Sequence, residues 1–332
     1  MKKILKAFSL LIATLAGIGV VFLLLFAIFF KINDPRDDIS ALVGYLTDRE
    51  LEITGDFSIK MYPSLAVEAG RITLSNTGEY GTGSFLNINH STVTINLLQL
   101  IRSGTISVDI MLEDFEGFFD LGPSGRTNWD DFVSSRTNIT GDVRGNIALQ
   151  GSGQTLSDVI ADFDGLVSLE LSDGVWHGID MWHEFRKARA SYKREPLPEI
   201  NNYRYTEIDS MRLEGLVNDG VLTSNYFILE SALFNVSGSG EVDLIDYDID
   251  YSVTAKLKSL LLIENDLSVD EKNDFVNEQF PVRIKGFINS PSFRPDIEEI
   301  FRLEVEKTIQ RRTQFLEKNL QKRSFNNLTP PQ

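Results

Sequence analysis

An uncharged apolar segment near the N-terminus constrains this chain more than any other feature. The segment Ala7–Phe30 is an unbroken run of 24 residues without a charged side chain. As a helix it would measure roughly 36 Å, which is enough to cross a hydrocarbon core of about 30 Å. Three lysines precede it within residues 1–6. The positive-inside rule therefore predicts that residues 1–6 stay in the cytoplasm and that everything after Lys31 is exported.

The alternative for the same segment is a cleaved signal peptide. Such a peptide has an apolar core of about 7 to 15 residues and ends at a cleavage site with small side chains. Here the run is longer, and it ends in Phe29–Phe30, whose bulk suits a signal peptidase badly. The flanking lysines disfavour a third reading, a buried helix. We therefore expect residues 7–30 to be a retained transmembrane helix.

Charge and cysteine content place the exported part in a compartment. The net charge is −16. Without the three N-terminal lysines, the chain has 29 basic and 48 acidic side chains. This excess argues against nucleic acid as a partner, because nucleic-acid binding needs a cationic surface. It also argues against broad docking on anionic lipid headgroups. No cysteine is present, so neither disulfides nor thiolate metal sites can form. These features fit a single-pass protein of the bacterial inner membrane with most of its chain in the periplasm.

The sequence after the apolar run predicts one short helix and then many strands. Apolar residues recur at helical spacing over 34–48, which predicts an amphipathic helix beside the membrane. From Gly55 to about residue 120, apolar and polar side chains alternate, as in half-buried strands. The clearest apolar sets are Val93, Ile95 and Leu97, and then Ile106, Val108 and Ile110. Turn residues between the runs favour an antiparallel meander.

The rest of the chain divides by composition. We expect residues 31–121 to form an N-terminal helix plus β segment, and residues 122–161, rich in Gly, Ser and Asn, to be a connection. A second β segment is expected over 162–295, interrupted by a helix over 179–194. Within it, Ser237-Gly238-Ser239-Gly240 reads as a turn or bulge.

The last part of the chain predicts an amphipathic helix over 296–323, followed by a disordered tail over 324–332. Its apolar side chains fall on one stripe, which we expect to rest on the sheet or cap its end. Contact with a partner or a membrane is the alternative. The stripe consists of Ile297, Ile300, Phe301, Val305, Ile309, Leu316 and Leu320.

A search for catalytic or metal motifs finds none. The sequence holds no HExxH zinc motif, no G-x-S-x-G nucleophile elbow and no phosphate loop ending in Gly-Lys-Ser/Thr. The alternating Asp246, Asp248 and Asp250 would point together into solvent, whereas calcium needs converging oxygens. We expect no catalytic residue, no metal and no cofactor, and therefore no enzyme.

The many one-sided strands leave an architectural choice. Their apolar faces must be covered, because large exposed apolar patches usually mark an interface or a ligand groove. Either the strands pair into a closed β-sandwich, which is the commoner solution, or one sheet curls into a trough that binds an apolar ligand. Periodicity alone leaves both open.

Several stretches of the chain resemble the AsmA family of inner-membrane-anchored periplasmic proteins. Each is weak alone, but their order along the chain makes the match fairly specific. They are Asp34-Pro35-Arg36, Ile53-Thr54-Gly55-Asp56-Phe57, Tyr62-Pro63-Ser64-Leu65, Gly125-Arg126-Thr127-Asn128-Trp129, Asp164-Gly165-Leu166, Asp173-Gly174-Val175, Gly178-Ile179-Asp180, Gly238 to Leu244, Phe280-Pro281-Val282, Lys285-Gly286, Ser290-Pro291 and Arg294-Pro295-Asp296. This chain departs from typical members by its short middle.

The resemblance implies a mainly β protein with one N-terminal transmembrane helix. Its curled antiparallel sheet would form an elongated apolar groove, capped by short helices and by the C-terminal amphipathic helix. The implied function is binding of phospholipid acyl chains, in support of lipid transport and outer-membrane biogenesis. The alternative is a non-enzymatic scaffold or regulator that binds outer-membrane assembly proteins and affects membrane protein localisation. The candidate groove lining is Val93, Ile95, Leu97, Ile106, Val108 and Ile110.

Overall fold

The computed structural model describes residues 35–60, 64–133, 138–199, 204–246, 248–258, 267–277, 279–287 and 290–326. The expected transmembrane helix over 7–30 lies outside these residues. Within the described ranges, no helix combines the length and the apolar character needed to span a bilayer.

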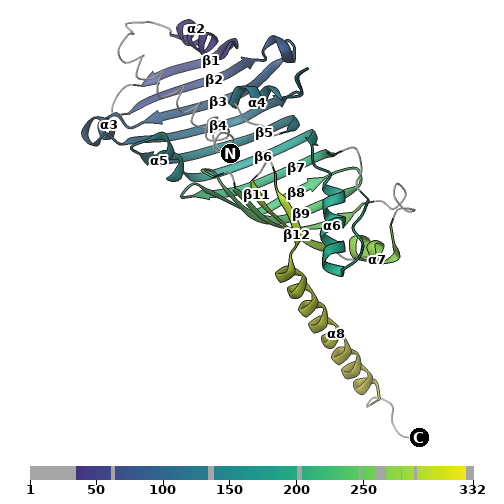
Figure 1. The fold of residues 1–332 in the computed structure, drawn as a ribbon. Coiled ribbons are helices and arrows are strands. Elements are labelled where there is room, and N and C mark those ends of the chain that lie inside the picture. The colour runs from purple at the N-terminus through teal and green to yellow at the C-terminus, as the bar shows by residue number, and fades with distance from the viewer. Residues whose placement is uncertain are drawn as a thin grey trace.

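The described strands form one antiparallel sheet in which every strand pairs with its neighbours in the chain (Figure 1). The fold is therefore mainly β, as predicted, and the meander is confirmed. Within the described ranges, all twelve strands belong to one sheet that does not close into a barrel, so these strands do not form the closed sandwich. The strands are β1 (Leu51–Lys60), β2 (Leu65–Ser75), β3 (Ser84–Ile95), β4 (Ile106–Phe119), β5 (Ile139–Gly153), β6 (Asp164–His177), β7 (Tyr205–Asn218), β8 (Val221–Glu230), β9 (Phe234–Asp243), β10 (Asp248–Leu257), β11 (Phe280–Phe287) and β12 (Ser292–Pro295).

Short helices lie between and beside the strands. The helix predicted over 34–48 is confirmed as α2, and the one predicted over 179–194 is confirmed as α6. The helical elements are α2 (Arg36–Thr47), η1 (Gly78–Tyr80), α3 (Leu97–Ser103), α4 (Asn128–Val133), α5 (Leu156–Ala161), α6 (Met181–Lys193), α7 (Val269–Lys272), the π-helical turn η2 (Asn273–Asn277) and α8 (Ile297–Asn326).

The alternation of side chains decides which face of the sheet is buried, and bulges keep that face continuous. In β4, Asp114 adopts a left-handed backbone with φ 48°, and the pairing with β5 shifts between Leu112 and Phe115. Leu112 and Phe115 are consequently both buried although they are three residues apart. We call this buried side the inner face and the opposite side the outer face.

The segment 122–161, expected as a connection, holds α4, β5 and α5. Strand β5 pairs with β4 on one side and with β6 on the other, so the sheet continues through this segment. Its glycines include Gly151 and Gly153, where an added Cβ would lie 2.6 and 2.5 Å from atoms of α5. These glycines therefore let α5 pack closely on β5.

The C-terminal helix α8 differs from its prediction. We expected its apolar stripe to rest on the sheet or cap its end, with contact to a partner or a membrane as the alternative, but α8 projects away from β12 (Figure 1). Ile300 is buried, whereas Ile297, Phe301, Val305, Ile309 and Leu316 are each at least 41% exposed. The helix extends to Asn326, three residues into the expected tail.

Candidate functional site

An apolar groove lies between α2 and the inner face of β1–β4, with an empty volume of about 1080 Å³ measured to its open side. We call it the α2 groove. Its lining consists of Ile39, Val43, Thr47, Leu51, Ile53, Phe57, Val67, Ala69, Ile72, Leu74, Leu86, Ile88, Ser91, Val93, Ile110, Leu112 and Phe132.

The lining offers almost no polar recognition. Fifteen of its 17 residues are apolar, and the exceptions are Thr47 and Ser91. The Thr47 hydroxyl already donates to the carbonyl of Val43 at 2.7 Å, inside α2. Because no charged group among the described residues lines the groove, it suits an apolar chain and gives a polar ligand little to bind.

One end of the groove is closed by the segment that carries the Asn-Trp element. Asn128 is fully buried; its amide donates to the Asn76 side chain at 2.8 Å and to the Phe118 carbonyl at 2.7 Å. Trp129 stacks on Phe119 with ring centroids 4.8 Å apart. The buried amide ties the segment to two strand ends, the indole packs in a buried cluster with Val43 and Leu74, and Phe132 of the same short helix lines the groove.

A buried arginine joins this closed end to α2. Arg49 is 2% exposed and donates to the carbonyls of Ser75, at 3.0 Å, and Asn128, at 3.1 Å. Its guanidinium also lies over the Phe85 ring, 4.1 Å from the centroid, where a cation is attracted to the aromatic face. Burial lowers the pKa of Arg49, but an arginine stays charged throughout the working pH range. Arg49 donates its hydrogen bonds to carbonyls of the protein itself. We therefore infer that it positions α2.

The inner face of the second half of the sheet is filled by α6. Phe185 of α6 is fully buried and meets Phe234 and Phe293 edge-on, each at 5.8 Å between centroids. One buried cluster joins residues of β6 through β12 with Met181, Phe185 and Ala188 of α6. This half of the sheet has therefore curled around a helix and closed its own core.

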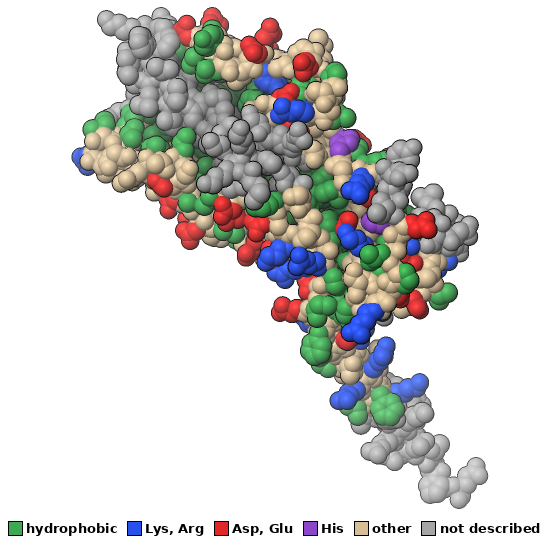
Figure 2. Space-filling view, in the orientation of Figure 1, with side chains coloured by type: hydrophobic (Ala, Val, Ile, Leu, Met, Phe, Trp, Pro, Cys, Tyr) green, Lys and Arg blue, Asp and Glu red, His purple; other side chains and the backbone are tan. Residues whose placement is uncertain are grey.

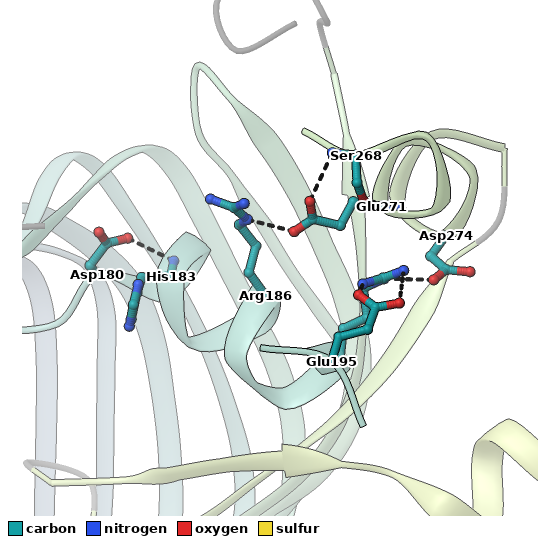
Figure 3. Close-up of polar contacts among 8 residues, drawn as sticks. Asp180, His183, Arg186, Glu195, Ser268, Glu271 and Asp274 are labelled. Atoms are coloured by element: carbon teal, nitrogen blue, oxygen red, sulfur yellow. Dashed lines mark hydrogen bonds and ion pairs between the residues drawn. The ribbon is translucent and has the colours of Figure 1, made fainter. Parts of the chain in front are cut away.

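Ion pairs fasten α6 to α7 and η2 (Figure 3). Arg186 donates to Glu271 at 2.8 Å, and Glu271 also accepts from the backbone of Ser268 at 3.0 Å. The buried Arg189 donates to Asp274 at 2.6 Å and to Glu195. Lys193 lies 3.5 Å from the same Asp274. These contacts hold α6 against α7 and η2.

Comparison with known families identifies the chain. The model of the AsmA family matches residues 1–140 and 135–227, which is more than half of the sequence and reaches into β8. The chain belongs to the AsmA family. Family membership suggests a role in outer-membrane or lipid-related biogenesis. Among curated proteins and among solved structures, the comparisons found no match.

The six predicted lining residues of this AsmA-family chain divide between groove and core. Val93 and Ile110 line the α2 groove. Ile95 and Val108 are 2% and 3% exposed in the buried core of β2–β8 and do not line the groove. Leu97 and Ile106 are half-buried and pack against that core. Leu97 is also the first residue of α3 and not a strand residue, because the Asn96 side chain accepts from the backbone of Gln99 and begins the helix.

Most of the groove lining was not predicted from the sequence. Ile39 and Val43 stand on the predicted helical face, and Ile72 and Leu74 on a predicted strand face, but nothing local pairs that helix with that strand. Strand β1 carried no clear alternation because its pairing with β2 shifts between Thr54 and Phe57. The signal in that region was the family segment Ile53 to Phe57, which contributes two lining residues.

The titratable groups do not assemble into a reactive site in the part of the chain that is described. His90, His177 and His183 lie on β3, β6 and α6. Burial lowers the pKa of His177, whose ring lies 3.2 Å from the Thr140 hydroxyl. Across the described residues, no group of three or more His, Asp or Glu side chains is placed to hold a metal ion.

Proposed function

We propose that this AsmA-family protein is anchored in the inner membrane by residues 7–30 and holds phospholipid acyl chains in the α2 groove. It would thereby support lipid transport for outer-membrane biogenesis. The observation that carries this proposal is the groove itself, a concave surface whose described lining is apolar and holds no charged group. Phospholipid acyl chains are abundant in a cell envelope, and an apolar surface of this kind suits them.

The position of the groove supports lipid entry from the bilayer. Only residues 31–34 separate the proposed membrane segment from Pro35, and four extended residues span at most about 14 Å. The roof of the groove, α2, begins at the next residue. A lipid tail could therefore pass from the membrane into the groove with little exposure to water.

The mechanism is passive solvation. Inner-face side chains such as Ile53, Val67 and Val93 replace the hydrocarbon surroundings of the tail, and the hydrophobic effect supplies the driving force. The headgroup stays in water at the open side. No bond is made or broken, so we propose a carrier and not an enzyme, with no cofactor.

A photo-crosslinking experiment tests the proposal. A photoreactive phenylalanine analogue is placed at Val93 in the groove or at Thr94, the next residue of β3, which faces the opposite side. The full chain is expressed in cells that carry radiolabelled phospholipid, and it is irradiated before purification. We expect a lipid adduct at residue 93 and none at residue 94. Equal adducts at both positions, or none at either, would overturn lipid binding in the groove.

A filling variant provides a second readout. Val93→Trp and Ile110→Trp add apolar volume to the groove without adding charge, so the sheet keeps its inner face. We expect less co-purifying phospholipid per protein by mass spectrometry, with Thr94→Trp as the matched control. Unchanged lipid in a folded Val93→Trp protein would contradict the proposal.

The second candidate function is a scaffold for outer-membrane assembly proteins or for membrane protein localisation. The observation that favours it is the exposed apolar stripe of α8, which the sheet does not cover. The crosslinking experiment separates the two candidates, because a scaffold would give protein adducts and no lipid adduct at residue 93.

A further inference from the structure

The outer face of the sheet carries a row of exposed apolar side chains that the proposed lipid site does not use. Met111, Ala148, Leu166 and Leu216 are register partners across the adjacent strands β4, β5, β6 and β7. Met111 is 40% exposed, Leu166 59% and Leu216 55%. The row lies in a hollow with an empty volume of about 1480 Å³, which Tyr226 borders. We call this the outer hollow.

The charged residues of the outer hollow are all acidic. They are Glu113, Asp114 and Glu214, and each is exposed. Neutral polar side chains such as Asn146 and Ser168 complete the border. An apolar floor with an acidic border fits a partner surface that is apolar in its centre and basic around it.

The distal half of α8 has that character. Residues 307–318 carry four basic side chains and one acidic one, in a chain whose net charge is −16. Figure 2 shows the Lys and Arg side chains of α8 beside its apolar ones. Val305, Ile309, Arg312 and Leu316 follow one another at spacings of four, three and four, so they share one side of the helix.

The two surfaces also agree in length. Four neighbouring strands span roughly 14 Å from Met111 to Leu216, at about 4.8 Å between strands. The helix side from Val305 to Leu316 spans roughly 16 Å, at about 1.5 Å per residue. The apolar side chains of α8 can therefore lie along the row while its basic side chains reach the acidic border.

The two surfaces of one molecule do not meet in this structure. Helix α8 leaves the sheet after β12 and points away from it (Figure 1). The outer hollow, in contrast, is lined by residues of β4–β8. An exposed helix gains most of its stability from packing an apolar side against another element. A second molecule of the same chain supplies such an element.

We propose that the distal half of α8 docks in the outer hollow of a second copy of this chain. Leu316 and Ile309 cover Leu166 and Leu216 of that copy, and Arg312 faces its Glu214. Reciprocal exchange of α8 between two copies gives a closed dimer, and one-way docking gives a chain of copies. This surface is independent of the α2 groove, on the opposite face of the sheet.

The absence of cysteine makes a direct test possible. The full chain is purified in detergent micelles as Leu216→Cys with one affinity tag and as Leu316→Cys with another, and the two are mixed under mild oxidation. The matched control replaces Leu216→Cys with Ile101→Cys, at an 80% exposed position on α3 outside the hollow. Docking holds the two thiols together, so we expect the mixed disulfide to form at least about tenfold faster than in the control.

Charge exchange identifies the contact. Glu214→Arg should lower the cross-linking rate, and the combination of Glu214→Arg with Arg312→Glu should restore it. Equal rates in the Leu216→Cys and Ile101→Cys mixtures would overturn the proposal. So would a fluorophore on Leu316→Cys that responds to vesicles containing anionic phospholipid but not to a second copy, because α8 would then bind a lipid surface.

Discussion

The first four strands and the last seven differ in what covers their inner face. Strands β1–β4 face a helix that touches them at one edge and leaves the α2 groove open. Strands β6–β12 surround α6, and their inner side chains form one buried cluster with it. Strands of both regions alternate apolar and polar residues, although β1 does so less clearly. The alternation therefore decides that a face is apolar, and the covering helix decides whether that face stays an open groove or becomes a closed core.

Two features of the second region make its closure possible. Glycines on the inner face let neighbouring strands approach: an added Cβ at Gly238 would lie 2.2 Å from the Ser252 carbonyl oxygen, and at Gly240 2.6 Å from Tyr251. Ion pairs from Arg186 to Glu271 and from Arg189 to Asp274 then hold α6 in place.

The largest expected effect separates core from groove. Phe185→Ala removes a fully buried ring and should lower the free energy of unfolding by about 3–5 kcal/mol. Phe57→Ala removes a half-buried ring at the groove edge and should cost less than about 1.5 kcal/mol, because part of that ring is already in water. Urea unfolding of the micelle-solubilised full chain measures both. Similar losses would mean that the groove is as closed as the core.

A somewhat smaller effect is expected at the buried ion pair. Arg189→Met leaves Asp274 without its main partner, and breaking a buried pair costs about 3–5 kcal/mol. Lys193 remains 3.5 Å from Asp274, so we expect a loss near the lower end of that range, about 3 kcal/mol. Arg189→Met combined with Asp274→Leu should recover much of the loss in the same urea titration. A double variant as unstable as the single one would show that the arginine acts through packing alone.

A third prediction concerns the inner glycines. Gly240→Ala forces a methyl group against Tyr251 in the next strand and should cost about 1–3 kcal/mol, the range for overpacking a core. Gly83→Ala is the matched control, because no atom lies within 4 Å of an added Cβ there. Thermal unfolding of both variants measures the difference. Equal midpoints would show that β9 and β10 can separate at no cost.

Much of this fold followed from local sequence patterns. The strands β2, β3, β4, β6 and β10, the meander order, α2 and α6 all depend on spacings within a few residues of one another. Leu97 was placed in a strand although the signal for α3 was present, with Asn96 as its N-cap and Gly104 at φ 69° as its C-cap. A strand-like run of three residues outweighed those two helix signals in the prediction.

The groove and the unpartnered α8 could not be predicted in the same way. Which helix lies over which strand depends on contacts between distant segments, such as Arg49 with Asn128, 79 residues apart. Ser237 to Gly240 predicted a turn or a bulge. The segment lies inside β9, where the pairing with β8 shifts between Ser224 and Phe227, and no local pattern indicates how closely β10 packs on Gly238 and Gly240. The apolar stripe of α8 was visible, but its pattern does not show whether the sheet or another molecule covers it.

The smallest expected effect is the response of the α6 attachment to acid. Burial by itself raises the pKa of Glu271, but the hydrogen bonds from Arg186 and Ser268 outweigh it and hold that pKa below the usual 4.5. A lowered carboxyl pKa means that the folded state is stabilised above the usual value, and that this stabilisation is lost as the pH falls through the lowered pKa. Glu271→Gln should therefore lose less stability than the parent chain between pH 7 and about pH 3.5.

The groove half supplies the contrast for this measurement, because the part of its lining that the structure describes holds no titratable side chain. In a Trp129→Phe, Trp176→Phe background, Trp182 of α6 reports locally, since its ring meets Phe275 of η2 edge-on at 4.9 Å. Acid should shift its emission before the whole sheet unfolds, and Glu271→Gln should remove that early shift. Lipid retained at residue 93 over the same pH range would show that the α6 attachment and the groove respond independently. Simultaneous loss of both signals would instead make the two halves one cooperative unit, which a single continuous sheet also permits.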